Sequence, residues 1–202
     1  MNIGVLGGTF DPIHYGHLII AEVAKARLDL AEIIFVPAGL PWLRTNIPLT
    51  AAEHRVQMVH LAIGNKPYFK LSTVEVERAG PSYTVETVAE LKGQLGAGDE
   101  LFFILGWDCL AELPRWWEPE RLIKLCRLAA VPRVDHPKPD LKSLEAAIPG
   151  LAQRVILLDI PLVDISASEI RQRVAQGLSI GHLVPEPVER YIREQGLYTT
   201  RP

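Results

Sequence analysis

Cysteine and long apolar runs are both scarce in this 202-residue chain, and each scarcity excludes a class of protein. The two cysteines, Cys109 and Cys126, form no C-x-x-C pair, so the sequence indicates neither a disulfide framework nor a zinc site. Charged residues such as Glu22 and Lys25 interrupt the longest apolar stretches, which fall far short of a membrane span. The chain opens directly into a short apolar run with no signal-peptide pattern. We expect a cytoplasmic protein without a membrane partner.

An excess of positive charge is also missing. Lys and Arg number 21 against 24 Asp and Glu, which gives a net charge of -3 and no overall basic field. Binding to nucleic acid through bulk charge is therefore not expected. What is abundant is apolar: 48% of residues are hydrophobic and 22% are charged, typical of a globular chain with a sizeable core. The length suits one domain, and we expect a single domain over 1–202.

Short apolar runs alternate with amphipathic segments along the chain. This order predicts an α/β fold, a doubly wound and mostly parallel sheet with helices on both faces. The predicted strands cover 3–6, 32–37, 69–78, 101–106, 128–131 and 155–158. The predicted helices cover 18–30, 50–63, 83–95, one or two short pieces in 110–125, 144–151, 166–176 and 185–194.

Several helix starts are predicted from capping residues. Pro12 after Asp11 suits the first turn of a helix, because proline has no N–H to lose there. Thr50 and Ser166 each stand three residues before a glutamate, which is the capping-box spacing. Ser82 is the expected cap of the helix that follows it.

The stretch Gly7-Gly8-Thr9-Phe10 links the first predicted strand to the first predicted helix. Strand, glycine turn and helix is an arrangement that binds phosphate, because helix N-termini present unpaired N–H groups. His14 and His17 are three residues apart, so both lie on one face of a first helical turn. The stretch matches neither the dinucleotide fingerprint nor a Walker A loop. Taken singly, each feature also fits an ordinary turn or a structural histidine; together they favour a phosphate site.

Polar residues follow two further predicted strands at the point where each one ends. Asp108 comes just after the apolar strand that ends at Gly106, and 164–168 come shortly after the last strand. In parallel sheets of this kind, ligands bind beyond the carboxyl ends of the strands. The sequence therefore predicts that these residues converge with Gly7–Thr9 on one site.

The stretch from Gly7 to His17 resembles the H-x-G-H signature of nucleotidyltransferases and, in full, the opening of bacterial nicotinate-nucleotide adenylyltransferases. Four other stretches and the tail are similar to the same family. They are S-x-T-x-x-T at 82–87, a strand ending in G-x-D at 103–108, the aromatic 113–117, I-S-x-S-x-I-R at 165–171, and 183–198. The resemblance spans nearly the whole chain and is specific in its combination of motifs.

The resemblance implies transfer of AMP from ATP to nicotinate mononucleotide, with ATP as co-substrate and Mg²⁺ carried on its phosphates. His14, His17 and Arg171 are the implied catalytic residues, and no residue is implied as a metal ligand. The implied ATP contacts are Gly7, Gly8, Thr9, Phe10, His14, His17, Gly106, Asp108, Ile165, Ser166, Ser168 and Arg171. The helical part from about 165 to 202 would complete the ATP site.

The resemblance also implies an acceptor pocket. Its residues would be Thr9, Arg44, Ser82, Tyr83, Thr84, Thr87, Asp108, Trp116, Trp117 and Arg133. Trp116 would stack on the pyridine ring, and Thr84 and Thr87 would receive the nicotinate carboxylate at a helix start. Without the family, Asp108 is equally well a helix cap, Trp116 a packing residue and Arg133 a solvated loop charge.

Two positions depart from the family pattern. Leu43-Arg44 stands where a His-Lys pair is expected, so the histidine donor is gone and a planar guanidinium replaces an ammonium. Ser168 replaces a common threonine and keeps the hydroxyl. Two alternatives stay open: a pantetheine-phosphate adenylyltransferase with the same H-x-G-H site, and a nucleotide-binding protein without turnover. The sequence leaves the oligomeric state open, a homo-oligomer included.

Overall fold

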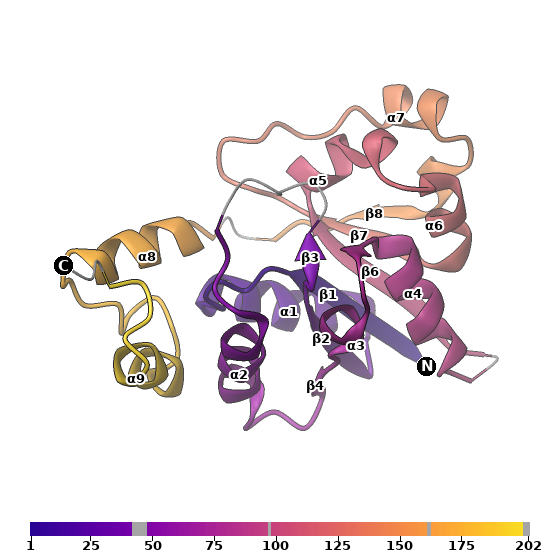
Figure 1. Ribbon diagram of the computed structural model, residues 1–202. Coiled ribbons are helices and arrows are strands. Elements are labelled where there is room, and N and C mark those ends of the chain that lie inside the picture. Colours follow the sequence, from indigo (N-terminus) through magenta and orange to yellow (C-terminus); the bar gives the residue numbers. More distant parts are fainter. Residues whose placement is uncertain (42–47, 97, 161–162, 200–202) are drawn as a thin grey trace.

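The computed structural model describes residues 1–41, 48–96, 98–160 and 163–199, and its centre is a six-stranded parallel sheet (Figure 1). The strand order is β4-β2-β1-β6-β7-β8, and every neighbouring pair is parallel. The strands are β1 Asn2–Gly8, β2 Glu32–Pro37, β4 Phe69–Leu71, β6 Glu100–Gly106, β7 Arg127–Val131 and β8 Val155–Leu157. Chain order reverses between β1 and β6, and such a switch point is where open α/β sheets bind ligands.

Side chains of the central strands alternate between two hydrophobic cores, as expected of strands that are buried on both faces. Leu6, Phe102 and Ile104 belong to one core, which contains residues of the helices α1, α2, α8 and α9. Val5 and Phe103 belong to the other, which contains residues of α4, α5, α6 and α7. The predicted doubly wound, mostly parallel sheet with helices on both faces is confirmed.

The helices have the following bounds in the described residues. They are α1 Tyr15–Leu28, α2 Ala52–Ile63, α3 Val74–Glu77, α4 Thr84–Gly93, α5 Trp107–Ala111, α6 Pro119–Leu125, α7 Leu141–Ala147, α8 Ala167–Ala175 and α9 Glu186–Glu194. Two 3₁₀ turns, η1 Leu113–Arg115 and η2 Leu151–Gln153, join some of them. Of the described helices, none is long and apolar enough to cross a membrane. Among the described residues, Cys109 and Cys126 form no disulfide.

The predicted strand over 69–78 is wrong after Leu71. The chain turns there into the short helix α3, whose last amide, that of Glu77, donates to the Thr73 carbonyl. In this conformation Glu75 is buried, and its carboxylate accepts a hydrogen bond from the Thr87 hydroxyl at 2.8 Å. A small second sheet follows, in which β3 Leu40–Pro41 pairs with β5 Pro81–Ser82.

Three of the predicted helix starts are wrong. Pro12 precedes α1, which begins at Tyr15, since residues 10–13 form a buried loop. The amide of Thr50 donates to the Asp11 carboxylate, and α2 begins after Ala51 without a side-chain cap. The Ser82 hydroxyl accepts from the amides of residues 39 and 40, so α4 begins one residue later. Ser166 does cap α8, accepting from the Glu169 amide at 3.1 Å.

The C-terminal helices lie on the α1–α2 side of the sheet (Figure 1). Val188 and Ile192 of α9 and Ile170 of α8 are buried in the same core as Met58 and Val59 of α2. The Tyr15 amide at the start of α1 donates to the Leu183 carbonyl at 2.9 Å. The last part of the chain is thereby held beside the loop that follows β1.

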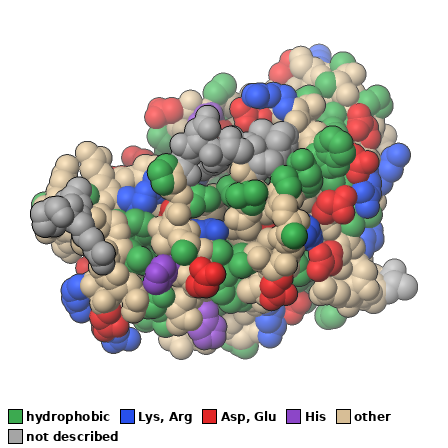
Figure 2. All heavy atoms as spheres, in the orientation of Figure 1, with side chains coloured by type: hydrophobic (Ala, Val, Ile, Leu, Met, Phe, Trp, Pro, Cys, Tyr) green, Lys and Arg blue, Asp and Glu red, His purple; other side chains and the backbone are tan. Residues whose placement is uncertain are grey.

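On the face in Figure 2, acidic and basic side chains are interspersed.

Candidate active site

A stacked pair of histidines lies at the start of α1. His14 is the N-cap and His17 the third helical residue, and their ring centroids are 3.7 Å apart. The His14 amide donates to Nδ1 of His17 at 3.3 Å. A ring nitrogen that accepts a hydrogen bond carries no proton, so the proton of a neutral His17 is on Nε2. His17 therefore offers an N–H donor at the cavity that it lines.

Gly16 between the two histidines is required by close packing. A Cβ at this position would lie 2.9 Å from both Cε1 and Nδ1 of His14 and 3.4 Å from a Val163 methyl. Real Cβ atoms essentially never approach that closely, so a larger residue would displace the His14 ring. The glycine in H-x-G-H thus allows the first histidine to fold back against its own helix.

Both imidazoles are neutral at pH 7. Burial, followed by the nearby Arg133 charge, lowers the pKa of His14 to about 4. Burial lowers the pKa of His17 well below its usual value, and the charges of His14 and Arg133 act in the same direction. The pair consequently provides neutral hydrogen-bond donors, whereas the positive charge beside it comes from arginine.

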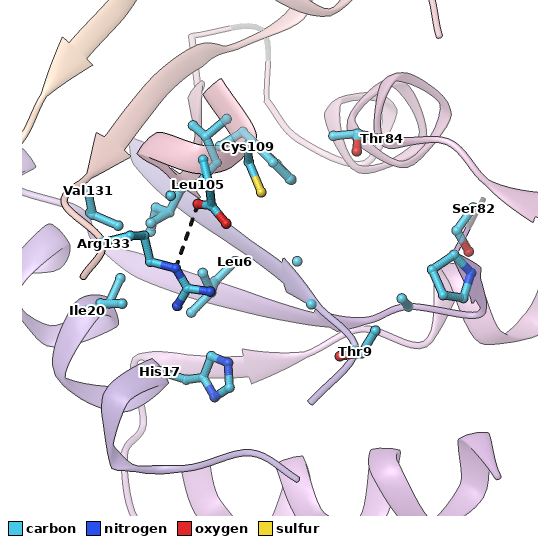
Figure 3. A pocket seen from close by; sticks show the side chains of 18 of the residues that line it. Leu6, Thr9, His17, Ile20, Ser82, Thr84, Leu105, Cys109, Val131 and Arg133 are labelled. Carbon is cyan, nitrogen blue, oxygen red and sulfur yellow. Dashed lines mark ion pairs between the residues drawn. The ribbon is translucent and has the colours of Figure 1, made fainter. Parts of the chain in front are cut away.

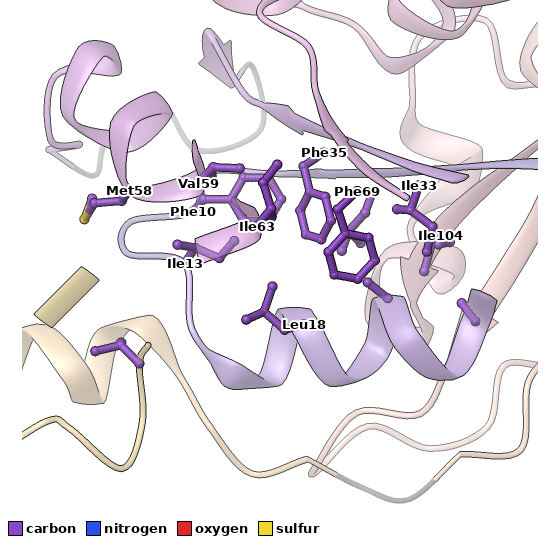
Figure 4. Close-up of a cluster of buried hydrophobic side chains, with 14 of the residues drawn as sticks. Phe10, Ile13, Leu18, Ile33, Phe35, Met58, Val59, Ile63, Phe69 and Ile104 are labelled. Carbon is purple, nitrogen blue, oxygen red and sulfur yellow. The ribbon is translucent and has the colours of Figure 1, made fainter. Parts of the chain in front are cut away.

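The loop after β1 is built around the buried Phe10 ring, which lies 5.0 Å from the His17 ring and 5.9 Å from that of Phe35 (Figure 4). A Cβ on Gly8 would stand 3.3 Å from the Phe10 ring, which is tighter than most real contacts. Phe10 itself has a left-handed backbone, with φ of 48°. Its side chain is buried in the core together with those of Ile13 and Phe35.

A polar cavity of about 350 Å³ lies between this loop, the histidines and the start of α8. Its described lining includes Thr9, Asp11, His14, His17, Arg133, His136, Asp164, Ile165, Ser166, Ser168 and Arg171. Arg171 is fixed by two hydrogen bonds, to the Asp11 carbonyl at 2.6 Å and to the Ser168 hydroxyl at 3.2 Å. The lining offers arginine and hydroxyl donors together with the N-terminus of a helix, which suits a polyanion.

A second, more apolar cavity of about 280 Å³ lies beyond the carboxyl ends of β1 and β6 (Figure 3). Its lining includes Gly7, Gly8, Thr9, His17, Glu75, Ser82, Thr84, Phe103, Leu105, Gly106, Asp108, Cys109, Trp116 and Arg133. The Trp116 ring packs edge-on to Phe103 at 6.3 Å, and its buried Nε1 has no hydrogen-bond partner among the described residues. A flat apolar wall with one unsatisfied donor suits an aromatic ring that carries a polar group.

The two cavities meet, because Thr9, His17 and Arg133 line both. Arg133 forms an ion pair with Asp108, with 3.7 Å between Nε and Oδ1, which the dashed line in Figure 3 marks. Arg133 is 43% exposed, so solvent screens this pair. A Cβ at Gly106 would stand 2.2 Å from the same carboxylate oxygen. Glycine is thus required at the end of β6 for Asp108 to face the pocket.

Most residues predicted from the sequence line these cavities, but four of the described ones do not: Phe10, Tyr83, Thr87 and Trp117. Tyr83 stacks on Trp117 at 5.4 Å between ring centroids, and neither is part of a cavity lining as described. The Thr87 hydroxyl is buried, accepting from Arg78 and donating to Glu75. Arg44, and with it the departure from the family pattern at 43–44, lies outside the described residues.

Four polar residues beside the site were missed: Asp11, Arg55 and Glu75, which are buried, and Tyr198, which is half-buried. Arg55 lies on the buried face of α2 with Met58, Val59 and Ile63, and a charge in that helical stripe was the available signal. Asp11 and Tyr198 are joined by a 2.6 Å hydrogen bond across 187 residues, which no local pattern predicts. Glu75 fell within the strand predicted over 69–78, which in the structure ends at Leu71. Burial raises the pKa of Glu75, and hydrogen bonds from Thr87 and Ser82 oppose that rise.

In the part of the chain that the structure describes, no group of three or more His, Cys, Asp or Glu side chains could hold a metal ion. The Asp11 carboxylate in the polar cavity already accepts from Tyr198 and from the Thr50 amide. This donor set does not fit a metal bound by the protein alone.

A strand, a glycine loop and a helix N-terminus that face a cavity suited to a polyanion are typical of a nucleotide-binding α/β protein. Comparison with known proteins shows to which family of this class the chain belongs. The model of the cytidylyltransferase-like family matches residues 5–173. A "probable nicotinate-nucleotide adenylyltransferase" of Dehalococcoides mccartyi is 50% identical over 198 residues, covering 98% of this chain and 97% of the relative. One from Thermomicrobium roseum is 44% identical, covering 98% and 92%.

A solved structure agrees with these relatives. Nicotinic acid mononucleotide adenylyltransferase of Plasmodium falciparum, complexed with NaAD, has a TM-score of 0.78 and 25% identity, over 98% of this chain and 97% of that one. The chain therefore belongs to the cytidylyltransferase-like family and, within it, to the nicotinate-nucleotide adenylyltransferases. The family resemblance predicted from the sequence is confirmed.

Proposed function

We propose that this protein transfers the AMP group of ATP to the phosphate of nicotinate mononucleotide, giving deamido-NAD and pyrophosphate in NAD biosynthesis. One observation carries the proposal: a polar cavity and an apolar, aromatic-lined cavity meet at Thr9, His17 and Arg133. The reaction needs such an arrangement, because a triphosphate and a pyridine nucleotide must meet at the α-phosphorus. The names of the relatives and the NaAD complex of the solved neighbour support the same reaction.

In the reaction an oxygen of the acceptor phosphate forms a bond to the α-phosphorus, and the bond to the bridging oxygen of pyrophosphate breaks. The acceptor phosphate is already ionised, so no general base is needed and no covalent enzyme intermediate forms. The protein has to align two anions and stabilise the charge that develops on the leaving group. We assign that second task to the Nε2–H of His17, with His14 beside it.

Arginines supply the positive charge. Arg171 would clamp the triphosphate from α8, and Arg133, which lines both cavities, would face the acceptor phosphate. Backbone N–H groups at Gly8, Thr9 and Phe10 would hold phosphate oxygens. Ile165, Ser166 and Ser168 would complete the ATP site from the start of α8, which is the role we propose for the C-terminal helical part of a single domain.

The apolar cavity would hold the acceptor. Trp116 offers a ring face to the pyridine, and Thr84, the first residue of the ten-residue helix α4, offers N–H groups to the carboxylate. Asp108 has a buried Oδ1 without a hydrogen-bond partner among the described residues, and a ribose hydroxyl would satisfy it. Tyr83 and Trp117 would contribute at the rim through backbone, and Thr87 through its contact with Glu75.

Mg²⁺ would enter as part of the substrate, bound to the phosphates of ATP. Such Mg²⁺ keeps waters and needs few protein ligands, consistent with the donor set in the polar cavity. A cytoplasmic location, the lack of a nucleic-acid or membrane partner and the open question of a homo-oligomer remain expectations from the sequence.

A pyrophosphate-release assay with ATP and three acceptors tests the proposal. Nicotinate mononucleotide, nicotinamide mononucleotide and phosphopantetheine are offered in turn, and we expect fastest release with the first. Release only with phosphopantetheine would establish the alternative acceptor. No release with any acceptor, while ATP still binds, would establish a binding protein without turnover.

A further inference from the structure

Asp11 is a buried carboxylate at which distant parts of the chain meet. Its side chain is 2% exposed; Oδ1 accepts from the Tyr198 hydroxyl at 2.6 Å and Oδ2 from the Thr50 amide at 3.1 Å. The backbone carbonyl of the same residue accepts from Arg171 at 2.6 Å. One residue of the phosphate loop thus binds the tail of the chain, the start of α2 and the triphosphate-facing arginine.

The opposite side of this cluster is closed by Arg55, whose side chain is 2% exposed. Its Nε and one terminal nitrogen donate to the carbonyls of Thr50 and Thr9, each at 2.9 Å. Burial lowers the pKa of Arg55, and the Asp11 charge is the largest influence that opposes this shift. The buried charges therefore compensate each other around the loop.

The Tyr198 hydroxyl stays protonated and acts as a hydrogen-bond donor to Asp11. Burial and the adjacent Asp11 carboxylate raise the pKa of its phenol, so the hydroxyl keeps its proton at any working pH. Its backbone is left-handed, with φ of 62°, as is that of Phe10 at 48° on the other side of Asp11. Non-glycine residues keep such conformations only where surrounding contacts hold them. Both belong to the segments that Asp11 joins.

We infer that Tyr198 is a positioning residue for ATP: through Asp11 it holds the phosphate loop and Arg171 at the geometry that receives the triphosphate. Tyr198 is absent from the described lining of both cavities, whereas Asp11 and Arg171 line the polar one. The tail therefore acts on the substrate through other residues. The kinetic test of this inference rests on the proposed function, because it measures turnover. A second test measures ATP binding alone and does not need turnover.

Tyr198→Phe removes the hydroxyl and leaves the ring, and Tyr191→Phe is the matched control. Tyr191 belongs to α9 and its hydroxyl bonds to Nδ1 of His54 on α2 at 2.8 Å, with no contact to the loop in the described hydrogen bonds. Hydrogen bonds to charged groups are the strong ones, so we expect kcat/KM for ATP to fall about tenfold in Tyr198→Phe. KM for nicotinate mononucleotide should stay within about twofold, and Tyr191→Phe should match the wild type in both constants.

A double-mutant cycle with Asp11→Asn separates positioning from general destabilisation. We expect Tyr198→Phe and Asp11→Asn together to lower kcat/KM for ATP no further than the more damaging single variant, because both break one contact. Additive losses, equal effects of Tyr198→Phe and Tyr191→Phe, or a parallel rise of KM for both substrates would each overturn the inference. Thermal melting of every variant identifies any that fails to fold.

The binding test keeps the inference distinct from the proposed function. ATP is titrated calorimetrically into the wild type, Tyr198→Phe and Tyr191→Phe without an acceptor. If ATP binds more weakly to Tyr198→Phe but not to Tyr191→Phe, the positioning role is supported, even where the wild type releases no pyrophosphate. The lack of pyrophosphate release would contradict only the proposed reaction. Equal ATP affinity in all three, with normal turnover in the wild type, contradicts only the positioning role.

Discussion

The two cavities are framed in opposite ways. Point contacts frame the polar one: two stacked histidines, an arginine held by two hydrogen bonds, and a buried carboxylate that accepts from the tail. Apolar faces frame the other, chiefly Phe103, Leu105 and Trp116. Hydrogen bonds to single atoms fix where the charged groups of the site lie, whereas apolar side-chain faces determine the shape of the ligand that fits. Changes in the polar cavity should therefore act on kcat and ATP, and changes in the apolar cavity on KM for the acceptor.

The sharpest test of this contrast is His17→Ala. Loss of a donor aimed at developing charge lowers kcat about 10²–10³-fold in comparable sites, and we expect the same here with little change in melting temperature. His60→Ala, at an exposed position near the end of α2, is the control. Pyrophosphate release measures kcat. A variant that retains the wild-type kcat would mean that the histidine pair is structural.

Gly16→Ala tests whether the position of the first histidine matters as much as its presence. The added Cβ would displace the His14 ring, and we expect kcat to fall about 10- to 100-fold, since small misplacements of catalytic groups have effects of this size. Gly93→Ala in α4 is the control, because a Cβ there meets nothing within 4 Å. That control should gain about 0.5–1 kcal/mol of stability from helix propensity.

Acidification should act on the two cavities with opposite sign. His14 has a pKa of about 4 when folded and an ordinary value when unfolded, so the unfolded chain takes up its proton first as the pH falls. Between pH 8 and pH 5 this residue alone lowers the free energy of unfolding by about 2 kcal/mol, and His17 acts in the same direction. Glu75, whose pKa is raised by burial, binds its proton more tightly in the folded state, so its protonation as the pH falls stabilises the fold.

Urea unfolding at pH 8 and pH 5 measures these contributions. His14→Asn should lose about 2 kcal/mol less than the wild type on acidification. Glu75→Gln should lose more than the wild type, because the stabilising protonation is absent. An acid response of His14→Asn equal to that of the wild type would contradict the buried, neutral state of the histidine.

The smallest effect is expected in the apolar cavity. Trp116→Ala should raise KM for nicotinate mononucleotide about tenfold and leave kcat and KM for ATP near their wild-type values, since aromatic stacking contributes about 0.5–1.5 kcal/mol beyond burial. Trp117→Ala is the matched control, because that side chain is 55% exposed and stacks on Tyr83 outside the lining. Initial-rate kinetics with each substrate varied in turn separates the constants. Equal responses at the two tryptophans would contradict the assignment of Trp116.

The fold was predictable where the sequence pattern is continuous. The buried strand at 101–106 and the parallel pair β1–β2 follow from unbroken apolar runs and from strand–helix–strand spacing. The prediction failed where a polar residue had a distant partner. Thr50 and Ser82 are typical cap residues, but the Thr50 amide donates to Asp11, and the Ser82 hydroxyl accepts from the amides of residues 39 and 40. Local propensity carries no information about such contacts.

The site was predictable through its motifs, and the residues that hold the motifs in place were not. His14, His17 and Arg171 fall in recognisable stretches and line one cavity. Asp11 was visible only as a helix-start signal, and Arg55 only as a charge in an apolar stripe. Their roles depend on contacts across 39 to 187 residues of sequence, which require the folded chain.

The same long separations have a consequence for protein synthesis. Asp11 leaves the ribosome well before its partners Arg171 and Tyr198, which follow 160 and 187 residues later. A nascent chain that has already formed β1, α1 and β2 still lacks the donors that hold the phosphate loop. Completion of the nucleotide site is thereby deferred until Tyr198 has been synthesised, so that a product truncated before this residue would fold its first strands without completing the ATP site.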